Sequence, residues 1–109
     1  MILHIDTKDQ KVIRVSLKED KKVIKSLSAK NKYGSQVLLP LIIKLVNRTY
    51  KPGLSTQFQT GFAKLKGIEV ETGPGSFTGI RVGVAVANAL AYSLKIPVNG
   101  KRMETELQY

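Results

Sequence analysis

The sequence predicts an α/β fold, a single lobe in which a five-stranded mixed sheet carries two long helices. Residues 2–29 contain three short runs that are apolar or alternate between apolar and polar residues, as in an antiparallel three-strand meander. After residue 35, two long helical patterns flank a fourth short run, an order typical of parallel strands joined by helices. The predicted element order is therefore β-β-β-α-β-α-β.

The three strands of the meander differ in their patterns. Residues 2–7 (ILHIDT) are largely apolar, which indicates a strand near the middle of the sheet. Residues 11–18 alternate, so that Ile13, Val15 and Leu17 share one face. Residues 22–29 form the third run. The connections have hairpin length, so we expect residues 8–32 to form hairpins with their lysines pointing outward.

The first long helix is predicted over residues 36–51, with Ser35 as its N-cap. Its polar residues form one narrow stripe, and the rest of the helix is almost entirely apolar. Pro40 lies past the first helical position, so the helix should bend or start late there. Pro52 and Gly53 end the pattern.

The second half of the chain holds the remaining elements. Residues 54–66 carry the weakest pattern, with Phe58, Phe62 and Leu65 spaced for a short helical turn. Residues 68–72 predict a strand, 76–95 the second long helix and 96–98 a short final strand. We expect residues 1–100 to form the lobe and the charged residues 101–109 to be a frayed tail or a short helix.

Composition excludes several classes of protein. The 109 residues suit one domain and include no cysteine, which excludes a disulfide scaffold and a thiolate metal site. His4 is the only histidine, which disfavours a histidine zinc site or a Ser-His-Asp triad within one chain. We expect no signal peptide, no membrane span, no metal and no cofactor, and a cytoplasmic location.

The chain is strongly basic, with a net charge of +10. Residues 8–32 hold nine basic residues against three acidic ones, so the meander alone carries +6. A positive field attracts phosphate backbones, and Lys21, Lys22 and Lys25 are the candidate RNA contacts. Aromatic residues make up only 6% of the chain, which disfavours direct reading of bases by stacking.

A glycine-rich stretch, TGPGSFTGIRVG, joins the fourth strand to the second long helix over residues 72–83. Such a turn can hold an anion on free backbone N–H groups. Neither standard phosphate-binding motif is present. The motif G-x-G-x-x-G, started at Gly73, needs glycine at the position of Thr78, and the motif G-x-x-x-x-G-K-[ST] has no match in the sequence. We therefore favour a packing role for the turn residues, which are Gly73, Pro74, Gly75, Ser76, Phe77, Thr78 and Gly79.

Three segments resemble the TsaB (YeaZ-like) family, bacterial proteins of tRNA threonylcarbamoyladenosine biosynthesis in the sugar kinase, heat-shock chaperone and actin (ASKHA) superfamily. These segments are ILHIDT at residue 2, SQVLLPLI at residue 35, and TGPGSFTGIRVGVAVANALAYSLKIPVNG at residue 72. The resemblance spans residues 2–100 and corresponds to the N-terminal lobe of that family. It implies an RNase H-like fold.

The resemblance also implies a role and partners. A TsaB-like protein would be a non-catalytic subunit that docks a TsaD-like transferase, with a TsaE-like ATPase and tRNA involved indirectly. When isolated it would form a homodimer. Family members usually carry a second lobe of similar size, and superfamily nucleotide sites lie between two lobes. Asp6 resembles the superfamily's carboxylate near phosphate and metal, but with one lobe we favour a simple turn-capping role.

The second long helix carries small residues at Gly79, Gly83, Ala87 and Ala91, which suits close approach by another element. Both long helices are apolar nearly all round, so either they cover each other completely or a partner covers what the sheet does not, and we favour a partner. The predicted partner-interface residues are Leu38, Leu41, Ile42, Leu45, Phe77, Gly79, Ile80, Gly83, Val84, Ala87, Leu90 and Ala91. Arg81, Asn88 and Lys95 form the expected solvated stripe.

Three functions follow as hypotheses. The leading one is the non-catalytic scaffold whose helix pair docks a TsaD-like enzyme. The alternative is a stand-alone basic RNA-binding module that uses the lysine-rich meander. An enzyme with its own nucleotide chemistry is the weakest, because no second lobe, phosphate-binding motif or plausible base is found.

Overall fold

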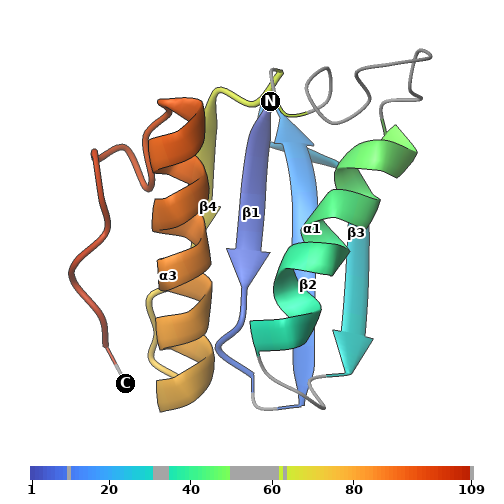
Figure 1. The fold of residues 1–109 in the computed structure, drawn as a ribbon. Coiled ribbons are helices and arrows are strands. Elements are labelled where there is room, and N and C mark those ends of the chain that lie inside the picture. Colours follow the sequence, from blue (N-terminus) through green and yellow to red (C-terminus); the bar gives the residue numbers. More distant parts are fainter. Residues whose placement is uncertain (10, 31–34, 50–61, 63, 109) are drawn as a thin grey trace.

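The structure is a computed structural model that describes residues 1–9, 11–30, 35–49, 62 and 64–108. Its elements form two layers, a sheet and a pair of helices that cover one face of it (Figure 1). In chain order they are β1 (Ile2–Asp6), β2 (Val12–Glu19), β3 (Lys22–Lys30), α1 (Ser35–Thr49), β4 (Gly67–Val70) and α3 (Phe77–Leu94).

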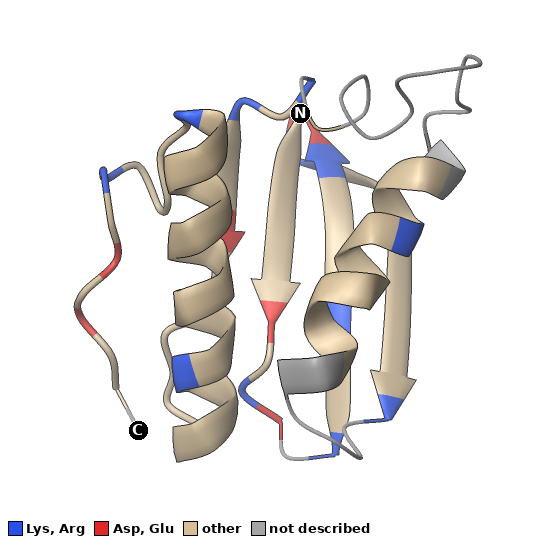
Figure 2. Cartoon of the chain, in the orientation of Figure 1, with Lys and Arg blue, Asp and Glu red and all other residues tan. Residues whose placement is uncertain are grey.

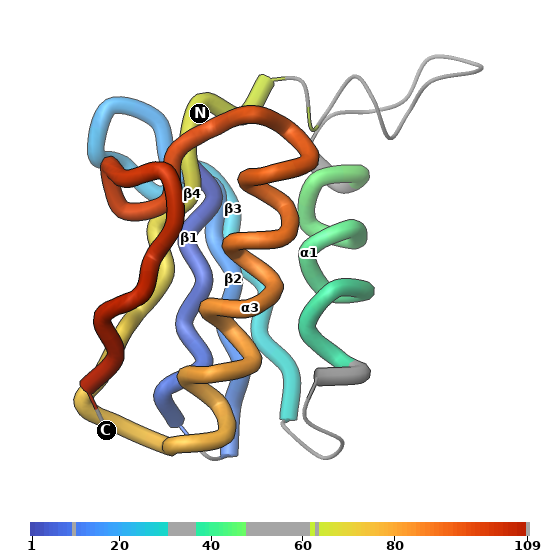
Figure 3. The backbone as a smooth tube through the Cα atoms, turned by 60° about the vertical axis from the view of Figure 1, so that its left-hand side comes forward, coloured from blue at the N-terminus to red at the C-terminus, as the bar shows by residue number. Residues whose placement is uncertain are grey.

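The sheet has the strand order β3-β2-β1-β4. β1 and β3 both pair antiparallel with β2, which confirms the predicted meander. β4 joins β1 in parallel after the crossover through α1, as the sequence predicts. α1 packs over β2 and β3 while α3 packs over β1 and β4, so the two helices lie side by side on one face (Figures 1 and 3).

The predicted fifth strand is wrong, because the described sheet has four strands. Val98 forms one isolated parallel bridge with Ile68, at the position where the fifth strand was expected. Pro97 has no N–H to donate to a longer ladder. Asn99 then turns the chain at a φ of 51°, and Val98 pairs back with Lys101.

The core lies between the sheet and the helices. Ile13, Val15 and Leu17 of β2 are buried on one face, which confirms the predicted alternation. Leu3 and Ile5 of β1 lie beside them in register with Leu17 and Val15. Buried residues of the helices close the core from the other side, among them Leu38, Ile42, Leu45, Val46, Ile80, Val84, Ala87 and Ala91.

The first helix begins at Ser35 and contains Pro40 within it, so it does not start late at the proline. Pro40 is exposed. Leu39 is also exposed, whereas Val46 is fully buried. The predicted turn near residue 60 lies mostly outside the described residues, although Phe62 and Leu65 are both buried in the core.

The β2–β3 hairpin closes with Asp20 and Lys21, whose φ angles of 52° and 67° are typical of a two-residue turn that matches strand twist. A register shift follows beside Leu17. Because of this shift, Lys25 pairs with Leu17 on the helix-covered face and is half-buried. Lys25 is therefore less exposed than Lys21 and Lys22 at the hairpin tip.

Residues 101–108 are neither a frayed tail nor a helix. They run in extended form beside α3 and β4 (Figures 1 and 3) and are held by hydrogen bonds. Asn88 of α3 donates to the Glu104 carbonyl and accepts from the Glu104 N–H, both at 2.9 Å. The Gln108 N–H donates to the Thr72 carbonyl at 2.7 Å. Asn88 therefore does not belong to a solvated stripe.

By length and composition alone, α3 is apolar enough to cross a membrane, and 33% of it is buried inside the fold. One such helix is weak evidence, because the core helix of a soluble protein passes the same test. The helix is capped at both ends. Ser76 accepts from the Gly79 N–H, and Lys95 closes the other end with a φ of 58°.

Candidate functional site

The glycine-rich turn packs against the chain itself. The Ser76 N–H donates to the Lys8 carbonyl at 2.8 Å. A side chain at Gly75 would overlap the backbone of Lys8, and one at Gly73 would overlap the carbonyl of Gln108. Gly73 also has a φ of 113°, which disfavours other residues. These contacts account for the glycines without a bound anion and support the packing role.

The small-residue ridge of α3 faces β1 rather than the outside. Gly79 and Gly83 are buried, and a Cβ at either position would overlap Thr7, which follows β1 directly. The Thr7 hydroxyl donates to the Gly79 carbonyl. Ala87 and Ala91 continue the ridge and are also buried. The ridge therefore brings α3 close to its own sheet.

This placement corrects the predicted partner surface. Most of its residues are buried in the core of the lobe and have no surface to offer a partner: Leu38, Leu41, Ile42, Leu45, Gly79, Ile80, Gly83, Val84, Ala87 and Ala91. Phe77 is 53% exposed, and Leu90 is half-buried. The sequence could not separate these two groups, because α3 is apolar on both its inner and its outer side.

The outer side of α3 is exposed and nearly uncharged. Its exposed residues include Ala85, Ala89 and Tyr92, with Tyr92 83% exposed. Val82 and Val86 lie half-buried along the same side. Arg81 is the only charged residue in α3, and its guanidinium carbon lies 5.1 Å from the centre of the Phe77 ring. Figure 2 shows how little charge the helix layer carries compared with the loops and strand ends.

The other face of the sheet carries a charged cluster. His4 of β1 lies 3.2 Å from Glu69 through Nδ1 and 3.7 Å from Glu71 through Nε2. Lys18 lies 3.0 Å from Glu69, and Lys8 lies 3.3 Å from Glu71. Hydrogen bonds from Lys18, which has the larger effect, and from His4 hold the pKa of the Glu69 carboxyl below its ordinary value.

The cluster does not have the geometry of a nucleophile and its base. Ser16 is the cross-strand neighbour of His4, but its hydroxyl donates to Ser26 at 3.2 Å. Both ring nitrogens of His4 face carboxylates. Asp6 accepts from the Lys8 N–H at 3.2 Å, which is the predicted turn-capping contact. Within the described ranges, no three His, Cys, Asp or Glu side chains meet in a way that could hold a metal ion.

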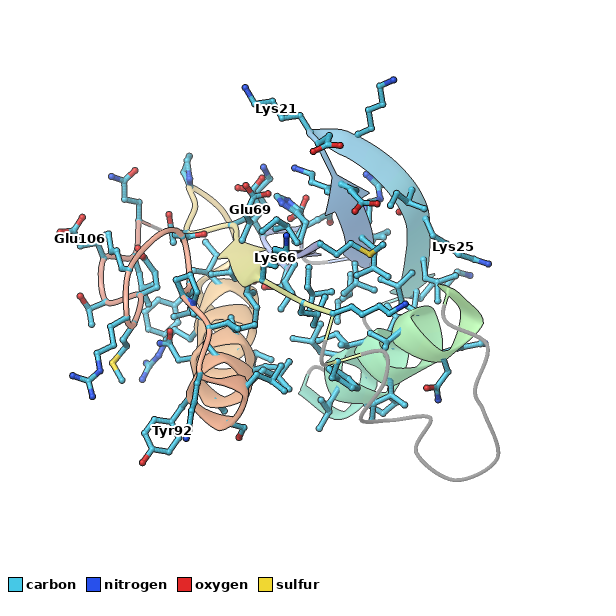
Figure 4. All side chains as sticks on the ribbon, turned by 90° about the horizontal axis from the view of Figure 1, so that it is seen from above. Lys21, Lys25, Lys66, Glu69, Tyr92 and Glu106 are labelled. Carbon is cyan, nitrogen blue, oxygen red and sulfur yellow. The ribbon has the colours of Figure 1, made fainter. Side chains whose placement is uncertain are left out.

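The candidate RNA contacts lie on β3 and its hairpin, at the edge of the sheet opposite β4. Lys21 and Lys22 are exposed at the tip of the β2–β3 hairpin, and Lys25 follows along β3. Figure 4 shows Lys21 and Lys25 extending away from the body of the molecule. Tyr92 points away from the opposite side of the molecule, on the helix layer. The basic residues and the outer side of α3 are therefore separate surfaces.

Several contacts that shape the fold could not be predicted from the sequence. Thr7, Asn88 and Asn99 each form hydrogen bonds to residues distant in the chain. Polar residues of this kind also occur in ordinary loops and on helix surfaces. Their pairing depends on the tertiary structure, so no local pattern identifies them.

Comparison with known proteins gives consistent relatives. Residues 35–100 match the family model of TsaD, described as tRNA N6-adenosine threonylcarbamoyltransferase. The chain is 34% identical over 98 residues to the tRNA threonylcarbamoyladenosine biosynthesis protein TsaB of Bacillus subtilis, which covers 90% of this chain and 39% of that protein. It is 39% identical over 80 residues to the TsaB of Buchnera aphidicola (subspecies Schizaphis graminum), which covers 73% of this chain and 34% of that protein.

Solved structures agree. YeaZ from Pseudomonas aeruginosa superposes with a TM-score of 0.69 at 27% identity, over 89% of this chain and 40% of that one. An uncharacterized protein with similarity to peptidase YeaZ from Pseudomonas aeruginosa superposes with a TM-score of 0.66 over the same shares. The chain thus spans about two fifths of the length of these structures and of the Bacillus relative. Because the family model matches more than half of the chain, the chain belongs to the TsaD family, and within that family it matches a part of TsaB/YeaZ.

Proposed function

We propose that this chain acts in tRNA threonylcarbamoyladenosine biosynthesis as a non-catalytic subunit that docks a TsaD-like transferase through the outer side of α3. The observation that carries the proposal is the exposed outer side of α3, which is apolar and includes small side chains. The whole helix has only one charged residue among its 18. An exposed helix side of a stand-alone domain normally carries several charged residues. The names of the relatives supply the pathway.

The geometry of α3 suits another helix as the docking element. Ala85 and Ala89 are exposed one turn apart, so a second helix can approach closely between the flanking larger side chains of Phe77 and Tyr92. A TsaD protein of the same family would carry an equivalent helix layer. Two related surfaces of this kind can pair about an approximate two-fold axis.

The non-catalytic part of the proposal is supported by the charged cluster. Its histidine faces two carboxylates instead of a hydroxyl, and the glycine turn is filled by the chain's own backbone. Acyl transfer needs a positioned base or metal and a closed site around the acyl-adenylate. We therefore assign the transfer chemistry to the partner.

The test is reconstitution with the TsaD and TsaE proteins of the same organism, tRNA and threonylcarbamoyl-adenylate. We expect modification to require this chain, and Ala89→Arg to abolish both TsaD binding and modification. Glu19→Arg introduces the same side chain at an exposed hairpin position and should change neither. Full modification without the chain, or ATP turnover by the chain alone, would disprove the scaffold role.

The RNA-binding alternative makes a different prediction. If the basic meander binds tRNA directly, the triple reversal of Lys21, Lys22 and Lys25 to glutamate should abolish modification while TsaD binding persists. Under the scaffold proposal, the reversal weakens only the salt-dependent association with tRNA. Gel shifts at several salt concentrations, run beside the modification assay, distinguish these two outcomes.

A further inference from the structure

The two edges of the sheet differ in whether their backbone N–H and C=O groups have hydrogen-bond partners. At the β4 edge, the Ile68 N–H donates to the Pro97 carbonyl at 2.9 Å, and the Asn99 N–H donates to the Ile68 carbonyl at 2.8 Å. The Asn99 side chain then accepts from the Val70 N–H at 2.9 Å and donates to the Val70 carbonyl at 3.1 Å. This edge is therefore satisfied by the chain itself. β3 forms the other edge and is the longest strand, with nine residues.

The register identifies which backbone groups of β3 face outward. The Glu71 N–H donates to the Ile5 carbonyl, so odd-numbered residues of β1 direct their backbone groups toward β4 and even-numbered ones toward β2. The backbone groups of His4 are therefore hydrogen-bonded to those of Ser16 in β2. The next residue of β2, Val15, directs its backbone groups the other way, toward Leu27 of β3.

Continuing this alternation, Leu27 and Ala29 bond β2, while Ser26, Ser28 and Lys30 direct their N–H and C=O groups away from the sheet. Within the described part of the chain, none of these three outward residues forms a backbone hydrogen bond beyond the ladder. The β3 edge thus presents a row of open donors and acceptors with strand spacing.

The side chains along this edge are basic and apolar. β3 contains Lys22, Lys25 and Lys30 and no acidic residue. Val23 and Ile24, at the register shift, are 55% and 48% exposed. A strand paired against this edge would meet a lysine on each face of the sheet, Lys25 on the helix-covered face and Lys30 on the other.

We propose that the β3 edge binds an acidic, extended polypeptide segment, which adds to the sheet as a further strand. The open backbone groups require an extended chain, and the charge selects an acidic one. A second copy of this chain is disfavoured, because two β3 edges would bring lysines together without any acidic residue to balance them. The proposal is independent of the proposed function, since the edge and the outer side of α3 are different surfaces.

The experiment uses the full chain and a synthetic peptide of alternating glutamate and valine, as long as β3. We expect the peptide to bind, with an affinity that falls as salt rises. Two control peptides should fail to bind: one with lysine in place of glutamate, and one with proline in place of alternate valines. The second keeps the charge but lacks the N–H groups that a strand needs.

A matched pair of variants tests the backbone. Ser28→Pro removes one outward N–H and leaves the ladder with β2 intact, so it should weaken peptide binding roughly tenfold, the upper effect of one lost hydrogen bond. Ser28→Ala keeps the N–H and should bind as the parent does. On the unmodified chain, amide exchange at Ser26, Ser28 and Lys30 should slow on peptide addition, while exchange at Leu27 stays unchanged.

Three results would overturn the proposal. One is binding of the proline-containing peptide as tight as that of the strand-forming one, since this would indicate charge attraction alone. Another is unchanged exchange at the outward amides, a readout that holds even if Ser28→Pro does not fold. The third is an oligouridylate that displaces the peptide and binds Ser28→Pro as tightly as the parent, which would make the edge a polyanion surface.

Discussion

Thr7, which follows β1 directly, contacts α3 at its two buried glycines. Its side chain is 1% exposed, and its hydroxyl donates to the Gly79 carbonyl. The two glycines of the helix leave the space that Thr7 occupies. Glycine in a helix interior is normally less favourable than alanine by about 1 kcal/mol, so the contact with Thr7 must outweigh that cost.

We predict that Gly83→Ala destabilises the fold by about 1–3 kcal/mol, the usual cost of overpacking, although alanine is the better helix former. The added methyl would overlap the Thr7 hydroxyl. In the double variant with Thr7→Ala the overlap is removed. The loss of stability in the double variant should therefore be smaller than the sum of the losses in the two single variants. Urea unfolding of the four proteins measures this coupling. A stabilising Gly83→Ala would contradict the proposed contact.

Glu69 gives the fold a defined response to acid. Its folded pKa is lowered by Lys18 and His4, so the folded state binds the proton more weakly than the unfolded chain. The stabilisation is complete above the ordinary pKa near 4.5 and is lost as the pH falls through the lower folded value. We predict that in Glu69→Gln the melting temperature falls less steeply as the pH is lowered below about 4.5. Glu106→Gln, at an 83% exposed side chain, should leave this slope unchanged.

At the scale of elements, Asn88 attaches the C-terminal segment to α3. Asn88 forms both a donor and an acceptor bond with the backbone of Glu104, which is 5% exposed. We predict that Asn88→Ala lowers stability by about 1–3 kcal/mol, because it leaves buried polar groups without partners. It should also speed amide exchange at Glu104. Ser93→Ala, on the exposed side of the same helix, should do neither, and equal effects would contradict the attachment.

Elements with a strong local period are predictable from the sequence, and those that depend on distant partners are not. The alternation in β2 is enough by itself to identify the buried face at Ile13, Val15 and Leu17. The prediction for the tail is wrong because its order comes from Asn88 and Thr72, which lie far from it in the sequence. Lys25 follows the alternation of β3 and shares a face with Leu27, but only its pairing with Leu17 shows that this face is the helix-covered one.

The same limit applies to the candidate site. The wide apolar arc of α3 predicts that a partner covers this helix, but spacing alone selects the ridge from Gly79 to Ala91 as the contact. Both sides of the helix are apolar, and the contacts of Gly79 and Gly83 with Thr7 show which side is inside. We therefore propose the contact at Ala85, Ala89 and Tyr92, which are exposed.

At the scale of the whole molecule, charge is divided between the layers. The hairpins and strand ends carry most of the lysines, whereas the helix layer is almost free of charge (Figure 2). Like charges repel when two copies meet through their basic sides. Self-association of this basic chain should therefore use the helix layer, which combines little charge with exposed apolar side chains.

We predict that the isolated chain forms a two-fold dimer through the outer side of α3. A two-fold axis places this side against its own copy, and Ala85 and Ala89 let the two helices approach closely. Ala89→Arg would introduce bulk and a like charge from both copies at the centre of the contact, so it should give monomers. Glu19→Arg makes a comparable side chain far from α3 and should leave the dimer intact. Light scattering across the micromolar range measures the mass, and a monomeric parent chain at the highest concentration would exclude this arrangement.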